Sequence, residues 1–110
     1  MTQPLCLVSD LDATGAKEII FNDADGARVS VFVVRYNGKI RAFVNSCPHA
    51  RLPLNFRDDQ FFDVTGQYIL CANHAAYFDV YTGQCVRGPC KGKSLQEFTV
   101  KVMDGAVLKG

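Results

Sequence analysis

The chain has 110 residues, of which 48% are hydrophobic, so length and composition predict a single domain over residues 1–110 with one core. Its 12 basic and 11 acidic residues nearly cancel, which argues against nucleic-acid binding, because that function depends on clustered positive charge. No stretch approaches the roughly 18 apolar residues of a membrane helix, and no secretory leader is visible, so we expect a cytoplasmic protein without a membrane partner.

The predicted elements are almost all strands, because β-branched and aromatic residues recur between turn signals. In chain order, strands are predicted at residues 18–21, 29–36, 39–44, 67–70, 76–81, 95–102 and 106–109. Asn37 and Gly38 predict a tight hairpin between the second and third of these strands. Single helical turns fit residues 11–17 and 56–62. The expected architecture is therefore all-β, with small antiparallel sheets.

Two short motifs carry the chemistry of this sequence. One is Cys47-Pro48-His49 and the other begins at Cys71 and ends at His74, and both follow a predicted strand. The two histidines of the chain both lie in these motifs, and such matched cysteine and histidine pairs predict a metal site. Two cysteines and two histidines can hold one tetrahedral zinc, or a two-iron cluster with the cysteines on one iron and the histidines on the other. The identity of the ligands alone does not decide between a zinc site and a two-iron cluster.

The residues around these motifs resemble the Rieske family, whose pattern is C-x-H, then C-x-x-H, then a later Gly-Pro turn. Residues 47–54 resemble the first cluster loop of the family, and residues 77–83 resemble the strand and turn after its second loop. Residues 88–95, which begin with Gly-Pro, resemble the proline loop that shields the cluster. The resemblance implies a Rieske-like fold in which two loops and this covering loop form a cluster-binding part at about residues 45–95.

The resemblance also implies a cofactor and a role. A [2Fe–2S] cluster would be bound by Cys47, His49, Cys71 and His74. The chain would be a soluble low-potential ferredoxin that carries single electrons, and not an enzyme. A reductase and an oxygenase or other acceptor would dock near the two histidines. Leu52, Pro53, Pro89 and Cys90 are either rim contacts for these partners or residues that simply pack around the cluster.

The low potential is expected from residues that the high-potential members carry and this chain lacks. Those members have a serine two residues after the second histidine and a tyrosine four after it, and both hydroxyls donate to sulfur. The same positions here are Ala76 and Phe78, while Tyr77 should face the other side of its strand. The extra cysteine pair of those members falls here at Leu52 and Asn73, so that disulfide cannot form.

The sequence departs from the family in two places. Residues 50–70 form a longer connection between the two motifs than the family usually has, and the extra length could cover the cluster or form a docking surface. Ala75 follows the second histidine, where the family usually has glycine. Asp58 and Asp59, within the long connection, are expected to form a solvated turn and not an acid and base pair.

The remaining cysteines are expected to be reduced. Cys85 and Cys90 flank the Gly-Pro turn and could bridge, but a reducing compartment favours two thiols. Cys6 is expected to be a small packed residue of the first strand. Just before the first motif, Asn45 and Ser46 either hydrogen-bond the loop backbone or only end the strand.

Three alternatives remain beside the ferredoxin. A small Rieske-like subunit of a larger oxidoreductase, as in assimilatory nitrite reductases, would keep the fold, although many such subunits lack the ligands. A structural zinc-binding module would keep the ligands without a redox role. An oxygenase component is disfavoured, because 110 residues leave no room for a mononuclear iron domain.

Overall fold

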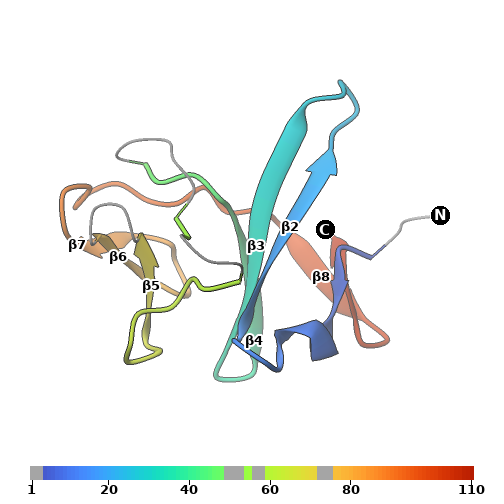
Figure 1. Ribbon diagram of the computed structural model, residues 1–110, viewed down its shortest axis with the longest axis horizontal. Coiled ribbons are helices and arrows are strands. Elements are labelled where there is room, and N and C mark those ends of the chain that lie inside the picture. Colours follow the sequence, from blue (N-terminus) through green and yellow to red (C-terminus); the bar gives the residue numbers. More distant parts are fainter. Residues whose placement is uncertain (1–3, 49–53, 56–58, 72–75) are drawn as a thin grey trace.

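The computed structural model describes residues 4–48, 54–55, 59–71 and 76–110, and within them nine strands form three antiparallel sheets (Figure 1). The sheet orders are β1-β9-β8, β2-β3-β4 and β5-β6-β7. The strands are β1 (Cys6–Leu7), β2 (Ala16–Asn22), β3 (Arg28–Tyr36), β4 (Lys39–Val44), β5 (Tyr68–Cys71), β6 (Ala76–Asp79), β7 (Cys85–Arg87), β8 (Val100–Met103) and β9 (Ala106–Lys109). The prediction of an all-β fold of small antiparallel sheets is confirmed.

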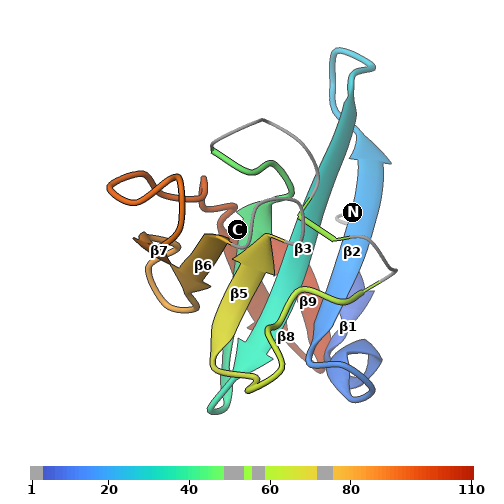
Figure 2. The ribbon, with the colours of Figure 1, turned by 60° about the vertical axis from the view of Figure 1, so that its left-hand side comes forward.

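The β2-β3-β4 sheet lies between the other two sheets. Figures 1 and 2 show β5, β6 and β7 on one side of it and β1, β8 and β9 on the other. Phe32 and Val34 of β3 belong to a core cluster on the side of β5 and β6, whereas Val33 belongs to a second cluster with Val107 of β9. Successive side chains of a strand point to opposite faces. The unbroken apolar run of β3 is therefore buried on both faces.

The hairpin between β3 and β4 follows the local sequence signal. Tyr36 pairs with Lys39, so Asn37 and Gly38 alone form the turn. Both have positive φ, 51° for Asn37 and 78° for Gly38, which a type I′ hairpin turn requires at its two central residues. This strand pair has the boundaries that the sequence predicts for residues 39–44 and extends the predicted strand at residues 29–36 by one residue.

The prediction of one long strand at residues 95–102 is wrong in its first half. Within these residues β8 begins only at Val100, and Glu97 makes an isolated bridge with Phe43. Phe98 N donates to Ala42 O at 2.9 Å, so this segment crosses the end of β4 before it joins the β1-β9-β8 sheet. Residues 95–102 therefore have the composition of one strand, but their first part contacts β4 and their last part pairs with β9.

Three further local predictions differ from the structure. The strand predicted at residues 76–81 ends at Asp79, whose Oδ1 accepts the backbone N–H groups of Tyr81 and Thr82 at 2.8 and 3.0 Å and starts a turn. The helical turn predicted at residues 11–17 is displaced to the 3-10 helix η1 (Val8–Leu11). The one at residues 56–62 falls partly outside the described residues, and its described end is extended, since Phe62 bridges Ile69.

No membrane-spanning helix is present in the part of the chain that the structure describes.

Candidate metal centre

Cys47 lies just beyond β4, where the chain leaves the central sheet. Val44 N donates to Gln96 O at 2.8 Å, and Asn45 N donates to Ser30 O at 2.9 Å, so the backbone is held up to the last residues before the motif. The Cys47 side chain is fully buried, with 0% of its surface exposed. A cysteine that is only a small apolar residue can also be buried, so the meaning of this burial depends on the groups around it.

The side chain of Asn45 closes the loop that carries the first motif. The backbone N–H of Leu54 donates to Asn45 Oδ1 at 2.9 Å, so residues 46–53 lie between the two ends of this hydrogen bond. Asn45 Nδ2 donates in turn to Glu18 Oε2 and to Asn55 Oδ1, both at 3.1 Å. A buried amide is stable when its donors and acceptor are satisfied in this way. Of the two alternatives for Asn45, the structure shows the hydrogen bond to the loop backbone.

Cys71 is the last residue of β5 and is also fully buried. It pairs with Ala76, the first residue of β6, so the two strands flank residues 72–75. Cys47 and Cys71 belong to the same buried cluster although they are distant in the sequence. His49 and His74 lie outside the described residues, as do Leu52, Pro53, Asp58, Asn73 and Ala75. Their predicted roles stay predictions.

The strand after the second motif has the two faces that the sequence predicts. Ala76 and Phe78 are both fully buried in the cluster that holds Cys47 and Cys71. Tyr77 lies on the other face, edge-on to Tyr68 with ring centroids 6.2 Å apart, and the guanidinium of Arg87 is 5.7 Å from its ring centre. The Tyr77 hydroxyl is therefore on the wrong side of β6 to reach the buried cysteines.

The segment after β6 turns back over the same cluster. Cys85 N donates to Lys93 O at 2.8 Å and Leu95 N donates to Gly83 O at 2.8 Å, which closes the turn between them. Gly83 has φ 75°, and a Cβ there would lie 2.8 Å from the ring of Phe43, so only glycine fits. β7, which the sequence analysis did not predict, is the first half of this turn.

Cys85 and Cys90 bring two more thiols to the buried cluster, and none of the five cysteines, all of which the structure describes, is in a disulfide. The sulfur atoms of Cys85 and Cys90 are 3.4 Å apart and are joined by a hydrogen bond, as two thiols would be. Burial raises the pKa of the Cys90 thiol to about 12, and its hydrogen bond with Cys85 and the charges of Cys85 and Cys47 add to this rise. Of the two alternatives for Cys90, the structure shows packing and not a rim contact, because 1% of its surface is exposed; Pro89 beside it is exposed.

Two residues that the sequence analysis placed apart from the centre have structural roles. Cys6 packs in the second core cluster, opposite Val107, as expected, and burial raises the pKa of its thiol ahead of the effect of Asp10. Asp59 Oδ1 accepts the backbone N–H of Glu18 at 2.7 Å, and its Oδ2 is 3.6 Å from Lys17 Nζ. Asp59 lies in a turn, as predicted, and it also ties the long connection to β2.

The long connection between the motifs is also part of the core. Phe61 is buried and stacks on Phe32 with ring centroids 4.2 Å apart. Leu70 N donates to Phe61 O at 2.8 Å, which joins this stretch to the residue before Cys71. Sequence reasoning missed this role, because a phenylalanine in a loop gives no local sign of the face that it packs against.

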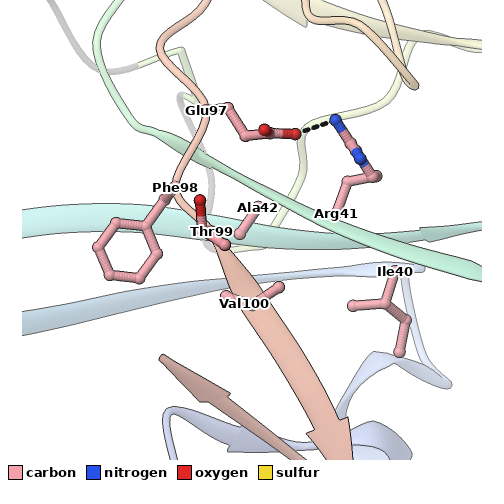
Figure 3. Close-up of a pocket in the computed structure, with 7 residues that line it drawn as sticks. All are labelled: Ile40, Arg41, Ala42, Glu97, Phe98, Thr99 and Val100. Carbon is pink, nitrogen blue, oxygen red and sulfur yellow. Dashed lines mark hydrogen bonds and ion pairs between the residues drawn. The ribbon is translucent and has the colours of Figure 1, made fainter. Parts of the chain in front are cut away.

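A hollow in the surface between β4 and β8 offers no competing site. Figure 3 shows that Arg41 and Glu97 form an ion pair there, beside Phe98 and Val100. None of the residues that line it is a cysteine or a histidine. Four of the five cysteines instead belong to the other core cluster, and Cys47 and Cys71 are two of them.

Comparison with known proteins adds a family to this geometry. The family model of the Rieske [2Fe-2S] domain matches residues 1–103. The ferredoxin of carbazole 1,9a-dioxygenase from Nocardioides aromaticivorans IC177 is 28% identical with a TM-score of 0.71, over 98% of this chain and 95% of that chain. A chain in the complex of reduced oxygenase and oxidized ferredoxin in carbazole 1,9a-dioxygenase is 27% identical with a TM-score of 0.71, over 96% and 89%.

A third solved structure shares the fold at lower identity. The Sphingomonas yanoikuyae B1 ferredoxin is 21% identical with a TM-score of 0.69, and the match covers 99% of this chain and 97% of that chain. No curated protein matches the sequence. The family model and these structures match nearly the full length of the chain and not only its two motifs.

Proposed function

This chain belongs to the Rieske [2Fe–2S] family, and we propose that it is a low-potential ferredoxin that binds its cluster through Cys47, Cys71, His49 and His74. One observation carries the ligand assignment. The two motif cysteines, 24 positions apart in the printed sequence, lie fully buried in one cluster beneath a closed turn. As a member of this family the chain is an electron carrier, and the ligand set and the potential are the parts that we add.

The described donors fit such a cluster. Metal ligation needs the thiolate form of cysteine, and two thiolates buried among Phe78 and Ala76 would be costly without a positive centre to neutralise them. When bound, the cluster accepts and returns one electron. The surrounding residues exclude water from the two sulfurs, and Asn45 holds the ends of the first loop together.

The potential is proposed to lie near the bottom of the Rieske range, which runs from about −150 to +300 mV. Hydrogen bonds to cluster sulfurs stabilise the extra negative charge of the reduced form and raise the potential. Ala76 and Phe78 are buried where a hydroxyl could make such bonds, and neither side chain can donate. Tyr77 has a hydroxyl but faces away. A midpoint well above zero millivolts would overturn this part of the proposal.

Metal and sulfide analysis of the purified full-length chain tests the function. We expect a red-brown protein with two irons and two acid-labile sulfides per chain, and a reduced-state EPR signal of low average g. The control is the same protein after the metal is removed by a chelator. A colourless protein that holds one zinc and no sulfide would replace the electron carrier with the zinc-binding module.

An oxygenase is the proposed acceptor, and a reductase the proposed donor. The solved ferredoxins that this chain is similar to include those of carbazole 1,9a-dioxygenase, in which a ferredoxin forms a complex with an oxygenase. We propose that partners dock near His49 and His74, where the two motifs meet the turn of residues 80–96, here called the covering turn. On that turn, Arg87, Lys91 and Lys93 are exposed, and residues 80–96 hold these three of the 12 basic residues and none of the 11 acidic ones.

Charged redox probes test whether electrons leave past this basic turn. The reduced protein is oxidised by an anionic complex, iron(III)–EDTA, at increasing salt. Because the net charge is only +1, we expect the salt dependence to report the local charge, so the rate should fall as salt screens the lysines. In the Lys91→Glu/Lys93→Glu variant the low-salt rate should drop several-fold.

The matched control for this experiment reverses two charges on the other side of the central sheet. Lys101→Glu/Lys109→Glu changes exposed lysines of β8 and β9 by the same amount of charge. We expect this control to keep the wild-type rate and its salt dependence. Equal effects of the two variants would mean that electrons do not leave past the covering turn, although the protein would remain an electron carrier.

A further inference from the structure

Three buried thiols gather where the covering turn meets the first motif. Cys90, Cys85 and Cys47 belong to one buried cluster, with 1%, 3% and 0% of their surfaces exposed. The Cys90 thiol donates to Cys85 Sγ at 3.4 Å, and Cys47 is close enough to act on the pKa of the Cys90 thiol. Cys90, which the proposed function leaves unused, therefore lies near a residue that the proposed function places on iron.

The turn holds Cys90 in this position. Its carbonyl accepts from Lys93 N at 2.9 Å, and Gly88 O accepts from Lys91 N at 3.2 Å, so the backbone on both sides of Cys90 is bonded within the turn. Gly88 has φ 106°, a conformation that favours glycine, just before Pro89. The Cys90 side chain therefore points into the core, while its neighbours Pro89 and Lys91 are exposed.

The partners of the three thiols decide where the Cys90 proton points. Cys85 Sγ donates to Arg87 O at 3.3 Å, so its own proton has an acceptor away from Cys47. Cys90 can then donate either to Cys85 or to Cys47. A metal-bound cysteine is a thiolate, and an ionised acceptor makes a stronger hydrogen bond than a neutral one. Metal binding at Cys47 should draw the Cys90 proton toward the Cys47 sulfur.

We propose that Cys90 is a positioning residue whose S–H donates to the Cys47 sulfur in the loaded protein and raises its reduction potential. This inference rests on the proposed function, because it needs Cys47 to be a ligand. Cys90 would act where Ala76 and Phe78 cannot, from the covering turn and not from β6. A thiol is a weak donor, so the effect is modest and agrees with a potential near the bottom of the range.

The potential of the loaded protein tests the proposal. In Cys90→Ala the equilibrium constant for reduction should fall by roughly two- to tenfold, read as a negative shift of the midpoint in voltammetry. Cys90→Ser keeps a donor and should restore much of the wild-type value. Cys85→Ala is the control, since it removes the neighbouring thiol and leaves the donor to Cys47 in place, so its midpoint should not fall. Iron and sulfide contents are measured for all four proteins.

The infrared S–H stretching band gives a second reading that needs no electron transfer. The Cys90 band, identified by its loss in Cys90→Ser, should move to lower frequency when metal-free protein is loaded, because the hydrogen bond strengthens. Cys6→Ser removes the band of a thiol in the other core cluster and helps to assign the rest. This reading remains available if Cys90→Ala fails to fold.

Two results would overturn the inference. One is a midpoint reduction potential that is unchanged in Cys90→Ala at full iron and sulfide content. The other is an infrared S–H band of Cys90 whose frequency does not change when the protein is loaded. Failure of the proposed function looks different, because wild-type protein would then bind no iron and sulfide. If zinc were bound instead, a shift of the band on adding zinc would support the hydrogen bond to Cys47, and an unmoved band would refute it.

Discussion

Replacing Cys47 by alanine is expected to abolish cluster binding, with iron and acid-labile sulfide falling from two each per chain to nearly none. The thiolate of Cys47 would be one of two on the same iron, and alanine supplies no donor. The buried position also leaves little room for a water to take its place, since Cys47 is fully buried with Cys71 in the same cluster. The measurement is iron and sulfide content together with visible absorption.

The matched control for this variant is Cys6→Ala, which removes another buried thiol. Cys6 lies on β1 in the second core cluster, whereas Cys47 lies in the first, and β1 is on the far side of the central sheet from β5 and β6 (Figure 2). We expect this control to keep full iron and sulfide and the wild-type spectrum. A Cys47→Ala protein that still holds two irons and two sulfides would show that Cys47 is not a ligand in this chain.

Replacing Phe61 by alanine is expected to lower the stability of the protein by about 3–5 kcal/mol, the usual cost of truncating a buried phenylalanine. Phe61 is 1% exposed and stacks on Phe32 with ring planes 9° apart. Its carbonyl also accepts from Leu70 N, next to Cys71, so the loss of packing should reach the second motif. We expect the melting temperature of the loaded protein to fall by at least about 10 °C.

Circular dichroism at one fixed heating rate measures this change, because a metal-bound protein need not unfold reversibly. Val64→Ala is the control, since Val64 lies in the same connection and is fully exposed. Truncation of such a surface residue usually changes stability by no more than about 0.5 kcal/mol. If both variants have the melting temperature of the wild type, the long connection does not contribute to the stability of the core.

The parts of the fold that the sequence predicted are those with a local physical cause. Asn37 and Gly38 adopt positive φ readily, so they determine the β3-β4 hairpin without help from the rest of the chain. The alternation of Ala76, Tyr77 and Phe78 between two faces follows from strand geometry alone. The two metal-binding motifs were predicted for the same reason, because each places a cysteine and a histidine within a few positions of each other.

The structure decided the features that depend on residues far apart in sequence. β7 is three residues long and pairs with β6 across a break in register at Tyr77 and Phe78, so no local pattern marks it. Phe61 and Phe32 are both in the sequence, but nothing in the sequence shows that their rings stack and so make Phe61 part of the core.

The candidate metal centre also has features that depend on local sequence and features that depend on the fold. The sequence by itself determined the candidate ligands Cys47 and Cys71 and the family to which they belong, because both depend on short motifs in a fixed order. Only the tertiary structure decided that Cys90 faces inward, against Cys85 and into the cluster that holds Cys47, because side-chain direction in a turn is set by the closure of the backbone. Hydrogen bonds between residues on both arms of the turn close the backbone, and no sequence pattern predicts these bonds.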